Sequence, residues 1–450
     1  MAGKTPYNHD LIRLDPFLVL PIELAQVVTT LLDFKSLVLC LRVCKHWNRF
    51  LSSLTPLWRD LDLSLARKAV SERAITSYIR RSKGSTTNVL ISQRAVTDAS
   101  LKPILSRIAT TCKEIKRLEI RLNGPPIVGI TETIPIAQSL TTLILHCVLR
   151  FEAASMVMAL CPNLVHAEFH QVQCPSRELP PWPGALERIR TFYLCHHNNR
   201  CAHVGVTWLL PFLDLMPNIR ELTLIDWRDA AVFIPFDYSG FRQLESLALI
   251  NCGISFFPSL PPTVRQLRVG PDVIMIMGDP ESQANLAANS LSQLKNLSLK
   301  GIDDLKVSDI MLILSHLPDR NNSPLRALCI DGCLDVTSAD LILLLASNAT
   351  ENLAELSLVN GVKVEDELAE IISEMKYLEH LDLSECPGLT GTAVKTLVNK
   401  SGKPLKRMNL NQCKSVGFDA VEMARESGVQ VDFLVADWLL GRSRKTSRIP

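Results

Sequence analysis

Aliphatic residues recur along the chain in a short pattern that alternates with polar positions. The clearest copies run LxxLxLxxC and begin at Leu244, Leu325, Leu378 and Leu405. Positions four and six of each copy are apolar between polar neighbours, which is the alternation of a short strand with one buried face. The pattern therefore predicts a strand at each copy. Looser copies begin at Trp58, Thr86, Ile115, Leu140, Leu164, Ile189, Ile219, Val264, Leu294 and Leu353.

The spacing of these copies and the segments between them predict the fold. Successive copies begin 20 to 31 residues apart, which overlaps the period of about 20–29 residues in leucine-rich repeats. A strand–helix unit cannot bury its apolar face alone, so neighbouring units must stack. The predicted fold class is α/β, with a leucine-rich-repeat solenoid, or horseshoe, of about 14 strand–helix units over residues 58–435. Apolar periodicity places helices at 154–160, 209–215, 308–317, 339–346, 365–375 and 392–398.

The repeats are irregular between residues 174 and 270. Two proline-rich runs, 180–183 and 258–262, interrupt them, and the units there have uneven lengths. Insertions in a solenoid map to loops, often on the binding face. An equally open interpretation is that extended segments replace the helices of these units.

Cysteine is frequent, with 13 in the chain, but no CxxC pair is present. Position nine of several copies, where the chain leaves the strand, holds a small residue. We interpret these cysteines as packing residues rather than redox groups, because nothing pairs them. With no signal-peptide pattern and no transmembrane run, we expect reduced thiols and a cytoplasmic or nuclear protein. The position-nine residues are Cys252, Cys333, Gly361, Cys386 and Cys413.

Residues 15–60 do not fit the repeat and form a separate block. Pro21 followed by Glu23 suits a helix start, residues 33–36 break the pattern, and a second helix is expected at about 37–44. About three short helices are too few to be stable alone, so the block must lean on the solenoid or on a partner. The chain ends are predicted to be a disordered N-terminus, 1–14, and a basic C-terminal tail, 436–450.

A Leu-Pro start, spaced aliphatic residues and two tryptophans follow one another in this block. The residues are Leu20, Pro21, Glu23, Leu32, Leu37, Val43, Cys44, Lys45, His46, Trp47, Trp58 and Arg59. Their order resembles an F-box over nearly its full length. An F-box followed at once by cysteine-containing leucine-rich repeats resembles the F-box/leucine-rich-repeat substrate receptors of SCF-type cullin-RING ubiquitin ligases. Two features depart from the pattern: Ala25, Gln26, Val27 and Val28 stand where larger aliphatic residues are usual, and His46 stands where a basic residue is common.

The resemblance implies a eukaryotic, non-catalytic protein. In this family the F-box binds a Skp-family adaptor, which links it to cullin and RING subunits, and the repeats bind a protein substrate for ubiquitination and proteasomal degradation. An alternative for Leu32, Leu37 and Val43 is that they form the core of the block itself. The implied adaptor contacts are Leu20, Pro21, Ile22, Leu24, Leu32, Leu37, Val43 and Trp47.

In a solenoid, strand positions three, five and seven point away from the core and form the concave face. That face is polar and mixed in sign here, which favours hydrogen-bonded recognition of a protein surface. For any one residue the alternative is a solvated side chain. The candidate substrate contacts are Lys300, Asp331, Glu355, His380, Asp382, Arg407 and Asn409, and earlier units supply Arg117, Glu119, Arg121, His166, Glu168 and His170.

Signals for chemistry are absent from the sequence. It holds no phosphate-binding loop, GxSxG or HExxH motif, so no catalytic residue and no cofactor is predicted. Cys195, His196, His197, Cys201 and His203 cluster, but their spacing is not that of a known zinc site, and a polar inter-repeat loop is the preferred interpretation.

Charge narrows the partners further. Lys plus Arg number 48 against 46 for Asp plus Glu, a formal net charge of +2. This balance argues against nucleic acid and membrane surfaces as partners. Two functions remain: a substrate receptor of a ubiquitin ligase, or an F-box-containing scaffold that acts outside a ligase.

Overall fold

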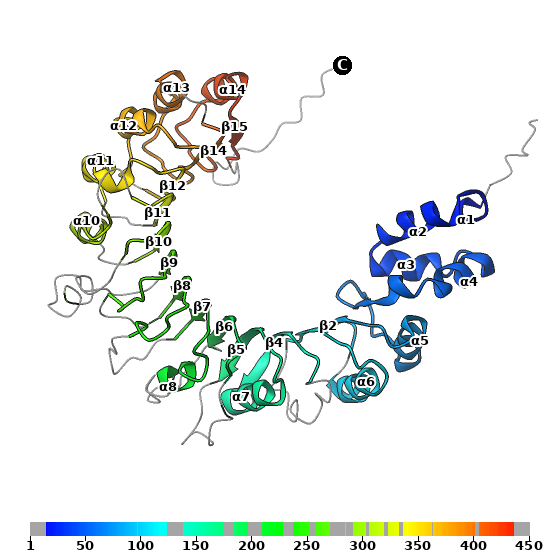
Figure 1. Cartoon of the computed structure of the whole chain (residues 1–450). Helices are drawn as coiled ribbons and strands as arrows, with labels where there is room; N and C mark the ends of the chain where they lie inside the picture. The colour runs from blue at the N-terminus through cyan, green and yellow to red at the C-terminus, as the bar shows by residue number, and fades with distance from the viewer. Residues whose placement is uncertain are drawn as a thin grey trace, which may run out of the picture. The chain divides into compact units, whose positions relative to one another are not determined.

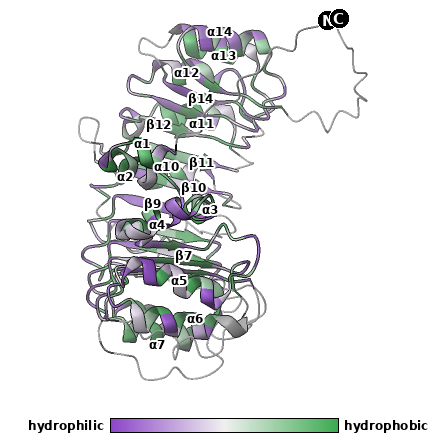
Figure 2. Ribbon diagram, turned by 90° about the vertical axis from the view of Figure 1, so that its right-hand side faces the viewer, coloured by the Kyte–Doolittle hydropathy of each residue, from purple (hydrophilic) through white to green (hydrophobic). Residues whose placement is uncertain are grey.

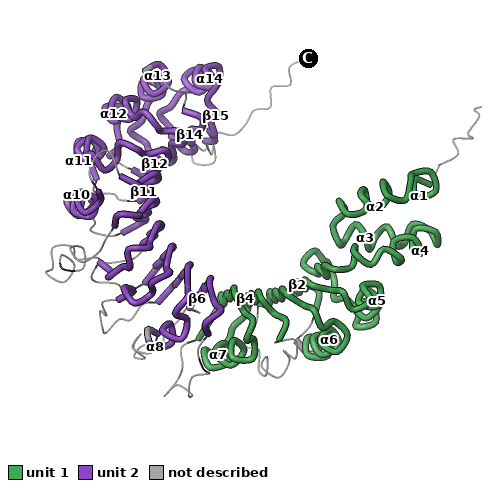
Figure 3. The backbone as a smooth tube through the Cα atoms, in the orientation of Figure 1, with its two compact units in different colours: residues 1–173 green, residues 174–450 purple. Residues whose placement is uncertain are grey.

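The computed structural model describes residues 15–96, 98–123, 138–173, 184, 186–196, 209–227, 237–252, 257–270, 284, 291–302, 306–318, 323–332, 336–361, 363–400 and 405–435. The chain divides into two compact units, residues 1–173 and 174–450 (Figure 3). The N-terminus and basic tail predicted at 1–14 and 436–450 lie outside the described residues.

The first unit opens with a block of short helices. They are α1 (Pro16–Val19), α2 (Ile22–Thr30), α3 (Phe34–Cys40), α4 (Lys45–Ser53) and the 3-10 turn η1 (Thr55–Trp58). The block thus has four α-helices where about three were predicted. The helix expected at 37–44 begins three residues earlier, because Asp33 acts as its N-cap and accepts a hydrogen bond from the Ser36 backbone N–H at 2.7 Å.

A small aromatic and aliphatic core holds the block together. Leu37, Leu41, Leu51 and Trp58 are buried in it, and the Trp58 indole N–H donates to the Leu51 carbonyl at 2.9 Å. Tyr78 of helix α5 (Glu72–Ser82) stacks on Trp58 with ring centroids 6.1 Å apart. The block therefore leans on the first repeat, as its size predicted.

Parallel strands follow in sequence order in the first unit, each pairing with the next: β1 (Asp60–Asp62), β2 (Asn88–Ser92), β3 (Arg117–Arg121), β4 (Thr142–Arg150) and β5 (His166–Gln173). Helix α5 is joined by α6 (Asp98–Thr111) and α7 (Phe151–Leu160). Position four of each copy pairs across strands, as Leu118 with Leu143 and Leu143 with Ala167.

The second unit continues the same strand–helix repeat. Its strands are β6 (Thr191–His196), β7 (Glu221–Ile225), β8 (Ser246–Ile250), β9 (Gln266–Val269), β10 (Asn296–Lys300), β11 (Ala327–Asp331), β12 (Glu355–Ser357), β13 (His380–Asp382), β14 (Arg407–Asn409) and β15 (Gln430–Asp432). Its helices are α8 (Leu209–Leu213), α10 (Val307–Ser315), α11 (Ser338–Leu345), η4 (Asn348–Thr350, a 3-10 turn), α12 (Leu368–Glu374), α13 (Gly391–Lys400) and α14 (Phe418–Glu426). Helices α10–α14 lie on one side of their strands (Figure 1). Each predicted copy holds a strand, which confirms the repeat solenoid of parallel strands and helices.

Alternation separates core from surface in most strands, although β3 and β4 also bury the residue at position five. In β10 and β11 the residues at positions four and six are buried, whereas positions three, five and seven stay accessible. We call the surface formed by positions three, five and seven the open strand face. Most side chains of the open strand face are accessible to a ligand.

Two features recur where the strands of the second unit end, one in the backbone and one in a side chain. Position eight adopts a left-handed conformation with φ between 57° and 63° at Asp226, Asn251, Asn360, Glu385 and Gln412. At position nine a buried thiol donates to the carbonyl at position six of the preceding repeat. These contacts are Cys252 to Leu224 at 3.4 Å, Cys386 to Leu358 at 3.2 Å and Cys413 to Leu383 at 3.0 Å. The predicted packing role of these three cysteines is confirmed, while Cys333 lies outside the described residues.

The described part of the irregular region holds both kinds of segment. Helix α8 (Leu209–Leu213) precedes β7, as the apolar periodicity predicted, whereas residues 257–260, before β9, form no helix and Ser259 makes a parallel bridge with Asp237. The other proline-rich run, 180–183, lies outside the described residues. None of the described helices is long and apolar enough to cross a membrane.

Candidate functional site

Exposed aliphatic side chains gather on the first three helices of the N-terminal block. They are between 47% and 81% exposed, although the block buries its aromatic core. Figure 2 shows α1 and α2 coloured largely as hydrophobic. So many exposed aliphatic groups on one small block indicate an interaction surface. We call this set the exposed apolar set, and its members are Leu18, Val19, Ile22, Leu24, Val27, Val28, Leu31, Leu39 and Val43.

Helix α2 turns small residues inward and large ones outward. Ala25 and Thr29, one turn apart, are fully buried, and the Thr29 hydroxyl donates to the Gln26 carbonyl at 2.8 Å. Val27 and Val28 point away from that side and are exposed. The departure from the F-box pattern at residues 25–28 therefore has two consequences. Ala25 permits close packing inside the block, and Val27 and Val28 add to the exposed apolar set.

The eight predicted adaptor contacts divide into accessible and internal residues. Pro21, Ile22, Leu24 and Val43 are exposed and Leu20 is half-buried. Leu37 is 3% exposed within the core of the block, and Leu32 packs against that core. Burial of Leu37 favours the alternative that it is a core residue of the block, and direct contact with an adaptor stays a prediction. Sequence reasoning missed Leu18, Val19, Val27, Val28, Leu31 and Leu39 as exposed aliphatic residues.

Trp47, another of the predicted adaptor contacts, is also half-buried, and a hydrogen bond to Asp15 fixes its indole ring. Asp15 accepts hydrogen bonds from the Trp47 indole N–H at 2.8 Å, from His46 Nδ1 at 3.1 Å and from the Phe17 backbone N–H at 3.0 Å. Partial desolvation raises the pKa of Asp15, but these hydrogen bonds outweigh it and leave the pKa below its ordinary value. The rings of Phe17 and Trp47 pack at a tilt, with their centroids 4.4 Å apart. Asp15 thus fastens α1, which carries part of the exposed apolar set, to α4.

A second candidate surface lies on the open strand face of the second unit. An open depression of about 530 Å3 runs over strands β11–β15. Five of the seven predicted substrate contacts line it: Glu355, His380, Asp382, Arg407 and Asn409. The strand register explains this, since Glu355 pairs with His380 and His380 with Arg407 on adjacent strands. The remaining two, Lys300 and Asp331, form an ion pair of 2.7 Å on β10 and β11.

Most polar groups in this depression already have partners within the repeats. Arg407 donates twice to Asp432, at 3.0 and 2.7 Å, and the Asn409 amide donates to Asp382 at 2.9 Å. Asp331 accepts from the Ser357 hydroxyl at 2.6 Å. Burial raises the pKa of Asp331, but Lys300 and the other donors hold it below its ordinary value. The exposed Glu355 and His380 are the side chains best placed to meet a ligand.

The cysteine and histidine cluster is only partly visible. The Cys195 thiol lies 3.8 Å from Asp226 Oδ2, and burial raises its pKa to about 11. Among the described residues, no group of three or more His, Cys, Asp or Glu side chains could hold a metal ion. His197, Cys201 and His203 lie outside those residues, so the alternative of a metal site is untested.

Comparison with known families identifies the N-terminal block. Residues 17–64 match the family model described as F-box-like. All nine members of the exposed apolar set fall inside this match. The block is therefore an F-box-like domain, as its residue order predicted, and it is followed by repeats.

A relative supports the same organisation over most of the chain. The chain is 24% identical over 453 residues to the F-box/TPR repeat protein pof3 of Schizosaccharomyces pombe, covering 93% of this chain and 74% of that protein. Among solved structures, a TLR13–ssRNA13 complex matches with a TM-score of 0.40 and 14% identity over 84% of this chain, which spans only 62% of that one. A Rad7–Elc1 complex from yeast matches with a TM-score of 0.37 and 14% identity over 78% of each chain. Both scores are too low to carry an argument about fold or partner.

Proposed function

We propose that the protein is the non-catalytic substrate-recognition subunit of an SCF-type ubiquitin ligase. The F-box-like domain binds a Skp-family adaptor and, through it, cullin and RING subunits, while leucine-rich repeats bind a protein target for ubiquitination and proteasomal degradation. The single observation that supports this most is the exposed apolar set, which lies inside the F-box-like match. A Skp-family adaptor is the partner that an F-box implies.

Proximity would be the whole mechanism. Tethering raises the local concentration of target lysines near the recruited conjugating enzyme, so no residue of this chain needs to act as a nucleophile. The repeats favour this role because their open strand face presents polar side chains on a regular frame. We further propose that the complex acts in the cytoplasm, the nucleus or both.

The experiment reconstitutes the ligase from purified components and asks which of them co-elute. The full chain should form a complex with the Skp adaptor, cullin and RING subunit. Val27→Asp with Leu31→Asp should abolish it, because Leu31 is 81% exposed and a buried carboxylate at such an interface has no partner. Truncating one anchor typically costs about 2 kcal/mol, roughly thirtyfold in affinity.

A matched control is available in the second unit. Leu343→Asp places the same charge on an exposed leucine of helix α11, which is 67% exposed, and should leave the complex intact. Unchanged assembly of the folded Val27→Asp/Leu31→Asp variant would overturn the proposal. Adaptor binding without cullin would favour the alternative of an F-box-containing scaffold that acts outside a ligase.

A further inference from the structure

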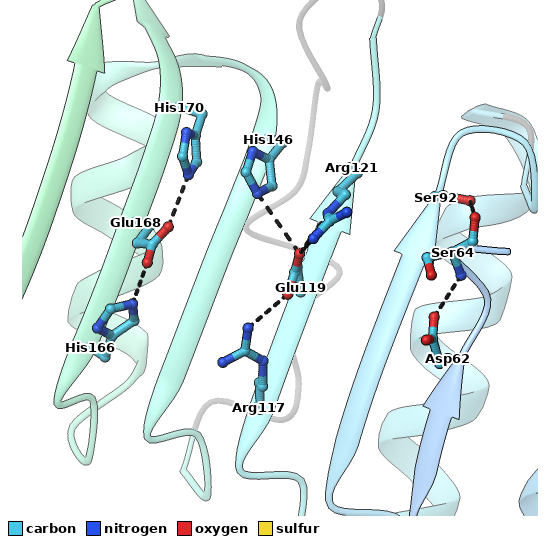
Figure 4. A network of polar contacts seen from close by, with 10 residues as sticks. All are labelled: Asp62, Ser64, Ser92, Arg117, Glu119, Arg121, His146, His166, Glu168 and His170. Atoms are coloured by element: carbon cyan, nitrogen blue, oxygen red, sulfur yellow. Dashed lines mark hydrogen bonds and ion pairs between the residues drawn. The ribbon is translucent and has the colours of Figure 1, made fainter. Parts of the chain in front are cut away.

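A buried carboxylate on β3, that of Glu119, lies between two arginines and binds both (Figure 4). Glu119 accepts from Arg117 Nη2 at 2.8 Å and from Arg121 Nε at 2.6 Å. Burial raises the pKa of Glu119, but hydrogen bonds and charge from the two arginines hold it below its ordinary value. His146 on β4 approaches the same carboxylate, with Nε2 at 3.8 Å from Oε1. Glu119 is therefore an ionised group that already pairs with two guanidinium cations.

The second carboxylate of this face is matched in the same way. Glu168 on β5 accepts from His166 Nε2 at 2.6 Å and from His170 Nε2 at 3.0 Å, and these bonds hold its pKa well below the ordinary value. The rings of His146 and His170 stack 3.7 Å apart. Both carboxylates on the open strand face of β3–β5 thus use both oxygens within the protein.

The two arginines that donate to Glu119 are much more exposed than Glu119 itself. The Glu119 side chain is 3% exposed, whereas the Arg117 and Arg121 side chains are 46% and 53% exposed. A guanidinium carries five N–H donors, and Glu119 takes one from Arg117 and two from Arg121. Over β3 an approaching molecule therefore meets N–H donors at the surface, with Glu119 below them, whereas on β5 Glu168 is 24% exposed, about as much as its histidine partners. Such a surface is complementary to anionic groups.

We propose that the open strand face of β3–β5 binds an acidic segment of a partner protein. Arg117 and Arg121 contact the carboxylates of this segment. Glu119 is a positioning residue that fixes both guanidinium groups from between them. This deepens the proposed function, because the acidic segment would belong to the ubiquitination target. The binding itself does not require the adaptor.

A protein fits this face better than a nucleic acid. The neighbouring outward positions on β4 are Thr142 and Ile144, which add no charge, and two carboxylates lie within the cluster. Among the described strand residues of β2–β5, no Phe, Tyr or Trp occupies the open strand face, so the only rings there are the imidazoles of His146, His166 and His170, which already contact one another or Glu168. A stripe of phosphates also requires a broad positive surface.

The probe is a fluorescent peptide of about twelve residues in which glutamate alternates with serine, because alternation places every carboxylate on one side of an extended chain. Matched peptides carry glutamine or lysine in place of glutamate. The full chain, without adaptor, should bind the glutamate peptide only. Arg117→Gln with Arg121→Gln should weaken this binding at least tenfold, while the circular dichroism spectrum and thermal midpoint confirm that the variant folds.

The control removes the same charge from a similar trio elsewhere. Arg220 and Arg265 flank Glu245 at 3.8 Å each in the second unit, so Arg220→Gln with Arg265→Gln should leave binding unchanged. No binding of the glutamate peptide, binding that survives Arg117→Gln/Arg121→Gln, or tighter binding of a single-stranded RNA of equal charge would each overturn the proposal. Adaptor assembly is measured separately, so failure here leaves the proposed function standing.

The positioning role of Glu119 has a readout of its own. Glu119→Gln removes a negative charge from the face, and bulk electrostatics alone would then tighten binding of the glutamate peptide. If Glu119 holds the two guanidinium groups in place, the same substitution weakens binding instead, by about threefold. Tighter binding by Glu119→Gln would contradict the positioning role.

Discussion

The F-box-like domain and repeats β10–β15 use the same aliphatic residues in opposite ways. In the repeats, leucines at positions four and six are buried, and polar groups on the open strand face pair across strands, as Asn409 does with Asp382. In the F-box-like domain, aliphatic residues such as Ile22 and Leu31 are exposed, and only a small aromatic core is buried. The repeats thus leave only scattered aliphatic residues exposed, such as Leu343, whereas the domain has nine within one small block.

The contrast also explains how the domain stays folded. Trp58 connects its core to the first repeat, since Tyr78 stacks on Trp58 and the Arg81 guanidinium lies 5.3 Å from the Trp58 ring centroid. Arg81 also donates to the Ser52 hydroxyl of α4 at 2.8 Å. A domain that borrows stability from a repeat can leave its own aliphatic residues exposed for a partner.

The largest effect is expected from removing this connection. Trp58→Ala should destabilise the first unit by about 3–5 kcal/mol, because it leaves a cavity in the shared core. Hydrogen exchange should then show lost protection in α1–α5 and unchanged protection in β10–β15. Equal loss of protection in both regions would show that the two regions fold as one and would break the comparison.

The next effect concerns how α1 is held. Asp15→Ala should weaken adaptor binding about tenfold, since α1 carries Leu18 and Val19 and would detach from α4. Asp15→Asn, which keeps an acceptor, should lose less. If Asp15→Ala binds the adaptor as tightly as the natural chain, α1 is not part of the adaptor surface.

The same contact predicts a pH dependence with a definite sign. The pKa of Asp15 in the folded chain lies below its ordinary value of 3.8. Its stabilising contribution is therefore present above that ordinary value and is lost as pH falls through the lower folded value. The indole N–H resonance of Trp47, followed in chain labelled with 15N-tryptophan, should shift in that acidic window, and the shift should vanish in Asp15→Asn.

A smaller effect is expected at the position-nine thiols. Cys386→Ala should lower the free energy of unfolding in urea by about 1 kcal/mol. The thiol donates to the Leu358 carbonyl, and removal of the thiol leaves that oxygen with one partner fewer. Burial raises the pKa of Cys386 to about 12, so a thiol reagent at pH about 8 should modify it only on unfolding. The exposed Cys44 should react in the folded chain. Rapid modification of Cys386 in the folded chain would contradict the role of a packed thiol.

The smallest effect, with the opposite sign, is expected at position eight. Gln412 has φ of 63°, a conformation that costs a non-glycine residue about 1 kcal/mol, so Gln412→Gly should stabilise the second unit by less than about 1 kcal/mol. Gly301 and Gly332 occupy the equivalent place in their repeats with φ of 53° and 74°. Asn411→Gly, one residue earlier, should lower the free energy of unfolding of the second unit. A loss of stability in Gln412→Gly would contradict the strain.

Much of the repeat architecture could be predicted from the sequence. The period-two alternation places each strand, and parallel register then brings Glu355, His380 and Arg407 together without further information. The left-handed turn at position eight was not predicted: Asn and Gly there are residue types that favour it, whereas Glu385 and Gln412 carry no such signal. The thiol-to-carbonyl contacts required coordinates, since they join different repeats.

The F-box-like domain was harder to predict in detail. Helix α1 has only four residues, too few to show a helical period. Asp33 lies in the predicted break at 33–36, whereas in the structure it caps α3. The outward direction of Val27 and Val28 follows from the burial of Ala25, and a pattern of apolar residues alone does not distinguish a surface meant for a partner from a core.

The most direct test of the central claim is calorimetric titration of the full chain with purified Skp adaptor at several temperatures and salt concentrations. Burial of the exposed apolar set predicts a negative heat-capacity change on binding and an affinity that hardly changes with salt. Val27→Asp with Leu31→Asp should remove the signal, and Leu343→Asp should preserve it. No binding heat at any temperature, or binding with a heat-capacity change near zero and a steep salt dependence, would contradict the account.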